Sequence, residues 1–292
     1  MRCFRLLVAT LVLATACGQA KAVQSQAPPV STAPSPPPAQ ALAGSAVRTA
    51  RAGSAHIALD MRMTVAPENE TLVAHASGVM SFRSRAAEMV TRTELPSGAF
   101  QTMREVTVWP VVYIRSPAFA ALQRRGRPWV KMNMATIGRA QGINLNALAG
   151  AGNDDPSQML SVLQGESDSI ETVGHATVRG VGTTHYHAVI DLSKVAAAAS
   201  PGLRAAVRRS EARLEAVLGA HTLPMDVWIG TDGRVRRLAY TVTVPLGANG
   251  ETMRMEFTMD MYGFGAPVQV KAPPAAQTTD ITAAVAAHAN GG

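Results

Sequence analysis

Histidine is the residue type with the clearest potential for chemistry in this sequence. His185 and His187 flank Tyr186, and His175 lies upstream. Because side chains alternate across a strand, the two flanking imidazoles share one strand face, as two ligands of a metal ion would. A metal site needs three or four ligands, usually with carboxylates behind them. The alternating apolar residues put both imidazoles on the polar face with Asp191, so we predict solvent-facing histidines and no metal site.

Carboxylates offer no better candidate for catalysis. Asp154 and Asp155 precede Pro156, and Asp155 has the position of a helix N-cap, which accepts hydrogen bonds from free amide groups. The sequence contains no G-x-S-x-G elbow, no Walker A run, no G-x-G-x-x-G opening a helix and no H-E-x-x-H. We therefore predict no catalytic residue and no cofactor, and an uncharacterised hydrolase is the least favoured interpretation.

The N-terminus has the pattern of an export signal. Two arginines precede an apolar run that is too short to span a bilayer as a helix but fits the central part of a secretory signal. The stretch LATAC that ends it resembles a bacterial lipobox, although Ala14 stands where that motif prefers leucine or valine. We predict that residues 1–16 are a signal peptide.

Cys17 is the candidate for lipid attachment. The other cysteine, Cys3, would leave with the signal, so the mature chain has no disulfide partner for Cys17. In a lipobox, the cysteine becomes the lipid-modified first residue of the mature protein. We predict that lipidated Cys17 anchors an exported protein to the cell membrane, on its extracytoplasmic side.

Composition divides the rest of the chain into three parts. Residues 17–45 are rich in Ala, Pro, Gln and Ser and can bury too little apolar surface to fold, which predicts a disordered tether behind the lipidated cysteine. Residues 46–279 have the length and turn spacing of one β-rich domain. Residues 280–292 are predicted to form a disordered tail.

Basic residues outnumber acidic residues, 27 to 20, which gives a formal net charge of +7. The basic residues are mostly arginine, which is more typical of a coding bias than of a nucleic-acid-binding surface, and we predict no nucleic-acid partner. We interpret the basic clusters as solvated faces, with contact to an anionic membrane or a phosphate as the alternative. The clusters are Arg124, Arg125 and Arg127; Arg204, Arg208, Arg209 and Arg213; and Arg234, Arg236 and Arg237.

Two stretches alternate methionine with polar residues. IALDMRMTV, 57–65, and MRMEFTMDM, 253–261, put apolar side chains on one face and polar side chains on the other, which predicts half-buried strands. Valine and isoleucine usually fill strand cores, whereas methionine adapts to varied shapes. This face is either solid core or the wall of an apolar cavity. The candidate ligand-binding residues are Met61, Met63, Met253, Met255, Phe257, Met259 and Met261.

Period-2 patterns dominate the rest of the domain. Turn signals such as 231–233 separate them, and strands do not alternate with helices, which predicts a largely antiparallel meander. We expect short helices at 117–125 and 155–164, a longer amphipathic helix at 201–218, and a mobile segment at 136–153. The predicted fold is α+β, with one large, curled antiparallel sheet and a few helices against its concave apolar face.

The order of several motifs resembles the LppX/LprAFG family of actinobacterial lipoproteins. These motifs are DPSQMLSVLQGESDSIETVG, VRGVGTTHYHAVIDL, an arginine-rich helix, LPMDVWIGTDGRVRRLAYTV and YGFGAPVQVKAPP, within residues 54–279. The resemblance implies a LolA/LprG-like half-barrel that wraps around helices and encloses an apolar cavity. It also implies binding of acylated lipids or glycolipids, their carriage or placement in the cell envelope, no covalent chemistry, and an envelope transporter as a partner.

Two functions stay open. In the first, the methionine face lines a cavity for acyl chains, and each buried methylene contributes roughly 0.8 kcal/mol. In the second, the sheet is solidly packed and the protein is a ligand-free envelope interaction or sensor lipoprotein. Met259→Trp distinguishes them, because it should abolish lipid uptake if the wall is hollow and destabilise the fold if the wall is core.

Overall fold

The computed structural model describes residues 36–67, 70–95, 97–124, 126–140, 142, 170–191, 219–246 and 251–288, and residues 204, 205, 208, 209, 212 and 215. The predicted signal peptide, Cys17 and the predicted helix at 155–164 lie outside these residues. Within them, no helix is both long and apolar enough to cross a membrane.

The described strands alternate side chains as the sequence predicts. Strands β1 to β6 are Ser54–Ala66, Glu70–Ser81, Ala86–Glu94, Phe100–Val108, Val111–Arg115 and Trp129–Asn133. Strands β7 to β12 are Ile170–Val178, Val181–Asp191, Thr222–Gly230, Val235–Pro245, Thr252–Tyr262 and Thr278–Asp280.

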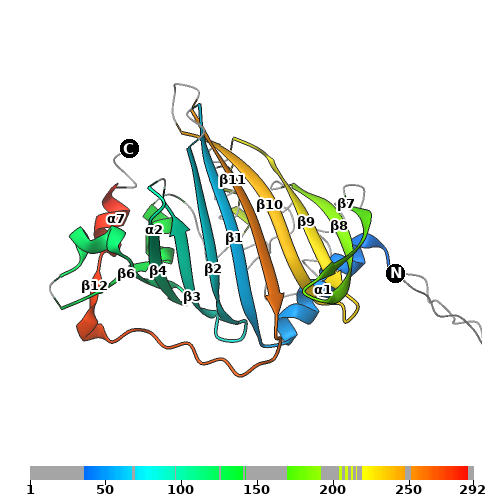
Figure 1. Ribbon diagram of the computed structural model, residues 1–292, viewed down its shortest axis with the longest axis horizontal. Coiled ribbons are helices and arrows are strands. Elements are labelled where there is room, and N and C mark those ends of the chain that lie inside the picture. The colour runs from blue at the N-terminus through cyan, green and yellow to red at the C-terminus, as the bar shows by residue number, and fades with distance from the viewer. Residues whose placement is uncertain are drawn as a thin grey trace, which may run out of the picture. The chain divides into compact units, whose positions relative to one another are not determined.

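All twelve strands belong to one open sheet, in the order β12-β6-β5-β4-β3-β2-β1-β11-β10-β9-β8-β7. Two meanders, β1 to β6 and β7 to β11, meet where β1 pairs with β11 at the centre of the sheet (Figure 1). Each described pair is antiparallel except β12 with β6, which is parallel. The predicted large, mainly antiparallel sheet is therefore confirmed, and an enclosed cavity stays a prediction.

Helices are short in the described part of the chain. The helix expected at 117–125 is a 3-10 helix, η1 (Pro117–Leu122), and Ser116 caps it by accepting from the backbone N–H of Ala118. The segment that we expected to be mobile, 136–153, begins inside the regular helix α2 (Met134–Ala140). Residues 143–153 of that segment lie outside the described residues. The described positions of the helix expected at 201–218 are helical. Its apolar stripe lies outside the described residues.

Helix α1 (Pro38–Arg51) corrects the predicted start of the domain. Residues 38–45, which we assigned to a disordered tether, form its first half, and the boundary at 45 is therefore wrong. Proline at the helix start fits the fixed φ of the first turn, and alanine is the best helix former. Ala39, Leu42 and Ala43 are buried in a cluster with β8 and β9 side chains. This tertiary packing stabilises a helix in a segment whose composition predicts disorder.

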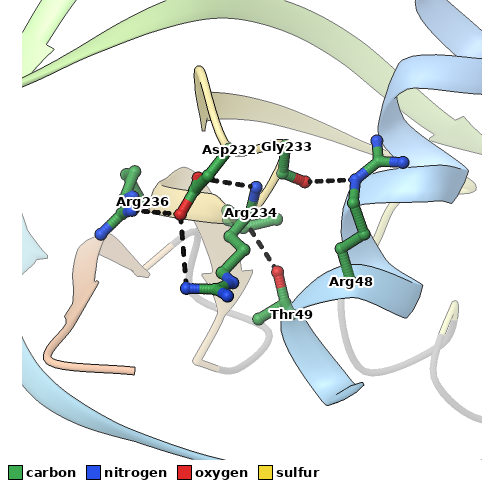
Figure 2. A network of polar contacts seen from close by, with 7 residues as sticks. Arg48, Thr49, Asp232, Gly233, Arg234 and Arg236 are labelled. Carbon is green, nitrogen blue, oxygen red and sulfur yellow. Dashed lines mark hydrogen bonds and ion pairs between the residues drawn. The ribbon is translucent and has the colours of Figure 1, made fainter. Parts of the chain in front are cut away.

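Polar contacts fix the end of α1 to the turn between β9 and β10 (Figure 2). The buried Thr49 hydroxyl accepts from the Val235 backbone N–H at 2.9 Å, and Arg48 Nε donates to the Gly233 carbonyl at 3.0 Å. Within the turn, Asp232 accepts from the Arg234 backbone N–H and pairs with Arg236. The predicted hairpin turn at 231–233 is therefore confirmed, and it also positions α1.

The C-terminal segment corrects the other domain boundary. The tail predicted at 280–292 begins inside β12 and contains α7 (Thr282–His288), so the boundary at 279 is wrong. Ile281 and Val285 pack on Ile114 and Val130, which explains the order of this segment. Through η3 (Ala275–Gln277), the chain after β11 leads from the centre of the sheet to its edge (Figure 1).

Candidate functional site

Strand pairing brings the two methionine stretches together at the centre of the sheet. In the β1–β11 register, Met61 lies opposite Phe257 and Met63 opposite Met255. Directly opposite residues of an antiparallel pair project to the same side of the sheet, with Cβ atoms about 5 Å apart. The predicted methionine face is thus one continuous surface formed by two strands from opposite ends of the domain.

Burial changes along this methionine face. Met261 is 6% exposed and belongs to the same buried cluster as Leu42 of α1, and Met259 packs against that cluster. The candidate residues farther from α1 are half-buried. Met261 is therefore core, whereas Met61, Met63, Met253, Met255 and Phe257 form a partly open surface.

Aromatic residues extend this surface onto β10. Tyr240 lies opposite Phe257, and the two rings stack with centroids 4.7 Å apart and planes 24° apart. Tyr240 is half-buried, and this burial raises the pKa of its phenol. The centre of the sheet thus offers flexible thioethers beside a flat aromatic pair.

Helices pack on the same side of the sheet at both ends of this surface. Leu59, Ala76, Thr91 and Met103 lie opposite one another on successive strands, so all four face this side of the sheet. Met103 packs against the Ile114 cluster, which contains Val285 of α7, and α1 contributes to the cluster around Met261. The half-buried methionines therefore lie between two helix-covered regions, as a ligand-binding wall would require.

The opposite side of the sheet is polar and holds His185 and His187. As predicted, both lie there, and both bond to Asp226 Oδ1, at 2.8 Å from His185 Nε2 and 3.2 Å from His187 Nδ1. His185 also stacks on Trp228 at 4.1 Å, and its side chain is 20% exposed, so it is less solvated than predicted. His175 pairs with Thr184 in register and therefore faces the other side, so the three histidines do not converge.

Asp260 is a buried carboxylate that the sequence analysis did not select. Arg237 binds it through two nitrogens, at 2.6 and 3.0 Å, and Arg179 Nε donates at 2.9 Å. Burial opposes ionisation, but the two guanidinium groups outweigh it and hold the pKa of Asp260 below its ordinary value. Arg179 and Arg237 are distant from Asp260 in the sequence. The alternation of residues along one strand therefore does not predict these ion pairs.

Comparisons with solved structures found similar proteins at low sequence identity. The lipoprotein LppX of Mycobacterium tuberculosis is 13% identical, with a TM-score of 0.44, and the match covers 81% of this chain and 100% of LppX. LprF of Mycobacterium bovis is 15% identical, with a TM-score of 0.38, covering 82% and 98%. A putative outer membrane lipoprotein-sorting protein domain from Vibrio parahaemolyticus is 8% identical, with a TM-score of 0.30, covering 79% and 93%.

LppX and LprF carry the names of the family that the sequence motifs resemble. No family model and no curated protein matches the chain. Similarity at these identities and scores carries no argument about function, which rests on this chain's own residues.

Proposed function

We propose that this protein is a membrane-tethered lipoprotein that binds acylated lipids or glycolipids on its methionine face and carries or places them in the cell envelope. The observation that carries the proposal is the half-buried strip of methionine and aromatic residues at the centre of the sheet. Unbranched thioethers can follow acyl chains of different shape, and the gain comes from moving methylenes out of water.

The export pattern supports the same proposal. An envelope lipid carrier needs an exported domain held near a membrane, and the sequence has a signal-like start with Cys17 at its end. The binding step requires no covalent chemistry by the protein. The competing proposal is an interaction or sensor lipoprotein, in which another protein would contact the polar side of the sheet.

Native mass spectrometry of residues 17–292 carrying Cys17→Ser, followed by solvent extraction, tests lipid binding. The structure favours Met255→Trp over Met259→Trp as the probe, because Met255 is half-buried and Met259 packs against the core beneath α1. We expect co-purifying acylated species near one per protein in the wild type. Met255→Trp should lose at least about nine-tenths of them while keeping its fold, since an indole fills the space an acyl chain would take.

Thr243→Trp is the matched control. Thr243 is exposed on β10, lies opposite Arg254 and faces the polar side, so an indole there adds the same bulk without touching the methionine face. It should leave the lipid content unchanged. A wild-type protein that is empty and takes up no lipid from vesicles would overturn lipid binding and favour the interaction module.

A further inference from the structure

Two pockets lie next to each other on the polar side of the sheet, near its β12 edge. One, of about 520 Å³, is lined by Arg104 and Arg115 together with neutral side chains. The other, of about 360 Å³, is lined by Arg124, Arg127 and Lys131. Both pockets take lining residues from the segment after η1: Gln123 and Pro128 in the first, and Arg124 and Arg127 in the second. We call these five cationic residues the arginine edge.

The first pocket contains a pair of arginines on neighbouring strands. Arg104 and Arg115 lie directly opposite each other in the β4–β5 register, and both are exposed. Val90 lies opposite Arg104 on β3, and the described residues that line the pocket include no carboxylate. Like charges that face each other across two strands destabilise a sheet, and an anion bound between the guanidinium groups would relieve this repulsion.

Polar groups that can bind an anion complete the first pocket. Thr102, Ser116 and Gln123 line it beside the arginines. Gln123 is held in place because its Nε2 donates to the Ser116 carbonyl at 3.2 Å, and Ser116 Oγ accepts from Gln101 at 3.0 Å. Hydrogen bonds thus hold two of the neutral side chains that line the pocket in place beside the arginines.

The second pocket is also positive. Lys131 Nζ lies 3.3 Å from Asp280, the one acidic residue among the described residues that line this pocket. Arg127 donates to the Thr278 carbonyl at 3.2 Å, which holds its guanidinium at the pocket wall. With three cations and one carboxylate, the lining carries an excess positive charge.

We propose that the arginine edge binds a phosphate group, either on a lipid headgroup at a bilayer surface or on a soluble phosphate compound. The guanidinium fork matches phosphate oxygens with two parallel hydrogen bonds, and each pocket has room for a phosphate with an attached sugar or polyol. Exposed Leu122 and Phe100 flank the first pocket, as apolar residues do on surfaces that contact bilayers. The site lies on the opposite side of the sheet from the methionine face and does not depend on lipid cargo.

Vesicle sedimentation and calorimetry test this site on residues 17–292 carrying Cys17→Ser, so that no lipid anchor drives binding. The probes are phosphatidylcholine vesicles with and without phosphatidylinositol, and inorganic phosphate and inositol phosphate in solution. The double variant Arg104→Gln with Arg115→Gln should bind phosphate-bearing probes roughly 30-fold more weakly, because each arginine near an anionic surface contributes about a factor of five. Its thermal unfolding midpoint without ligand should stay the same or rise, since a repulsion is removed.

Arg208→Gln with Arg209→Gln is the matched control, because it removes the same charge from exposed helical positions outside both pockets. Binding to phosphatidylinositol vesicles alone would show that the site recognises a phosphate on a bilayer surface. Binding to the soluble phosphates as well would show that it also accepts a phosphate compound free in solution. An equal loss in both double variants would show general charge attraction and overturn the site. Absence of wild-type binding to every phosphate probe would overturn it too.

Discussion

Asp260 shows how a single residue on the polar side is stabilised by distant partners. Its side chain is 10% exposed, and the guanidinium groups that bind it come from β10 and from the turn between β7 and β8. Asp260→Asn would remove the carboxylate that both guanidinium groups bind. We expect it to lower the free energy of unfolding by about 2 kcal/mol, measured by urea denaturation at neutral pH.

The pH dependence of this loss follows from the pKa of Asp260. The folded-state pKa lies below the ordinary value of 3.8, so the ion pairs contribute fully above that value and lose their contribution as the pH falls through the lower folded value. The difference between wild type and Asp260→Asn should therefore shrink in acid. Glu256→Gln is the control, because its carboxylate is 44% exposed and its loss should cost well under about 1 kcal/mol. Equal losses in the two variants would contradict this account.

At the scale of elements, α1 is the segment whose order depends most clearly on tertiary packing. The buried hydrogen bond from the Val235 N–H to Thr49 ties the helix to the β9–β10 hairpin. Thr49→Val keeps the shape of the side chain but leaves that amide without an acceptor. We expect a loss of about 2 kcal/mol in urea denaturation, whereas Thr49→Ser retains the acceptor and should lose less than half as much. If both variants unfolded alike, the bond would not be what holds α1.

For the sheet, the sequence predicts individual strands and their faces but not how the strands pair. Alternation in IALDMRMTV and MRMEFTMDM correctly predicted two strands and the face that each presents. Their pairing could not be predicted, because they are separated by most of the domain and many strands offer the same alternation. Helix α1 was not predicted for a related reason. Its Pro- and Ala-rich segment is helical because Ala39 and Leu42 pack against residues of distant strands.

For the whole molecule, the main prediction concerns the membrane anchor. If Cys17 carries the lipid, Cys17→Ser should abolish incorporation of labelled palmitate into the protein in cells, because the serine cannot form the thioether. Cys3→Ser is the matched control, since Cys3 lies in the segment predicted to be removed. Unchanged labelling of Cys17→Ser would mean that the palmitate is attached to another residue.

The sequence by itself predicted an export signal, and it determined the alternating strands and the chemical character of the two sheet faces, because these depend on local composition and on a period of two residues. The tertiary structure decided which strands pair, where the domain begins and ends, and which methionines are core. It also brought Arg104 opposite Arg115 and Asp260 to Arg237. These features depend on contacts between distant segments, whose partners are chosen by packing and charge in three dimensions and leave no local pattern in the chain.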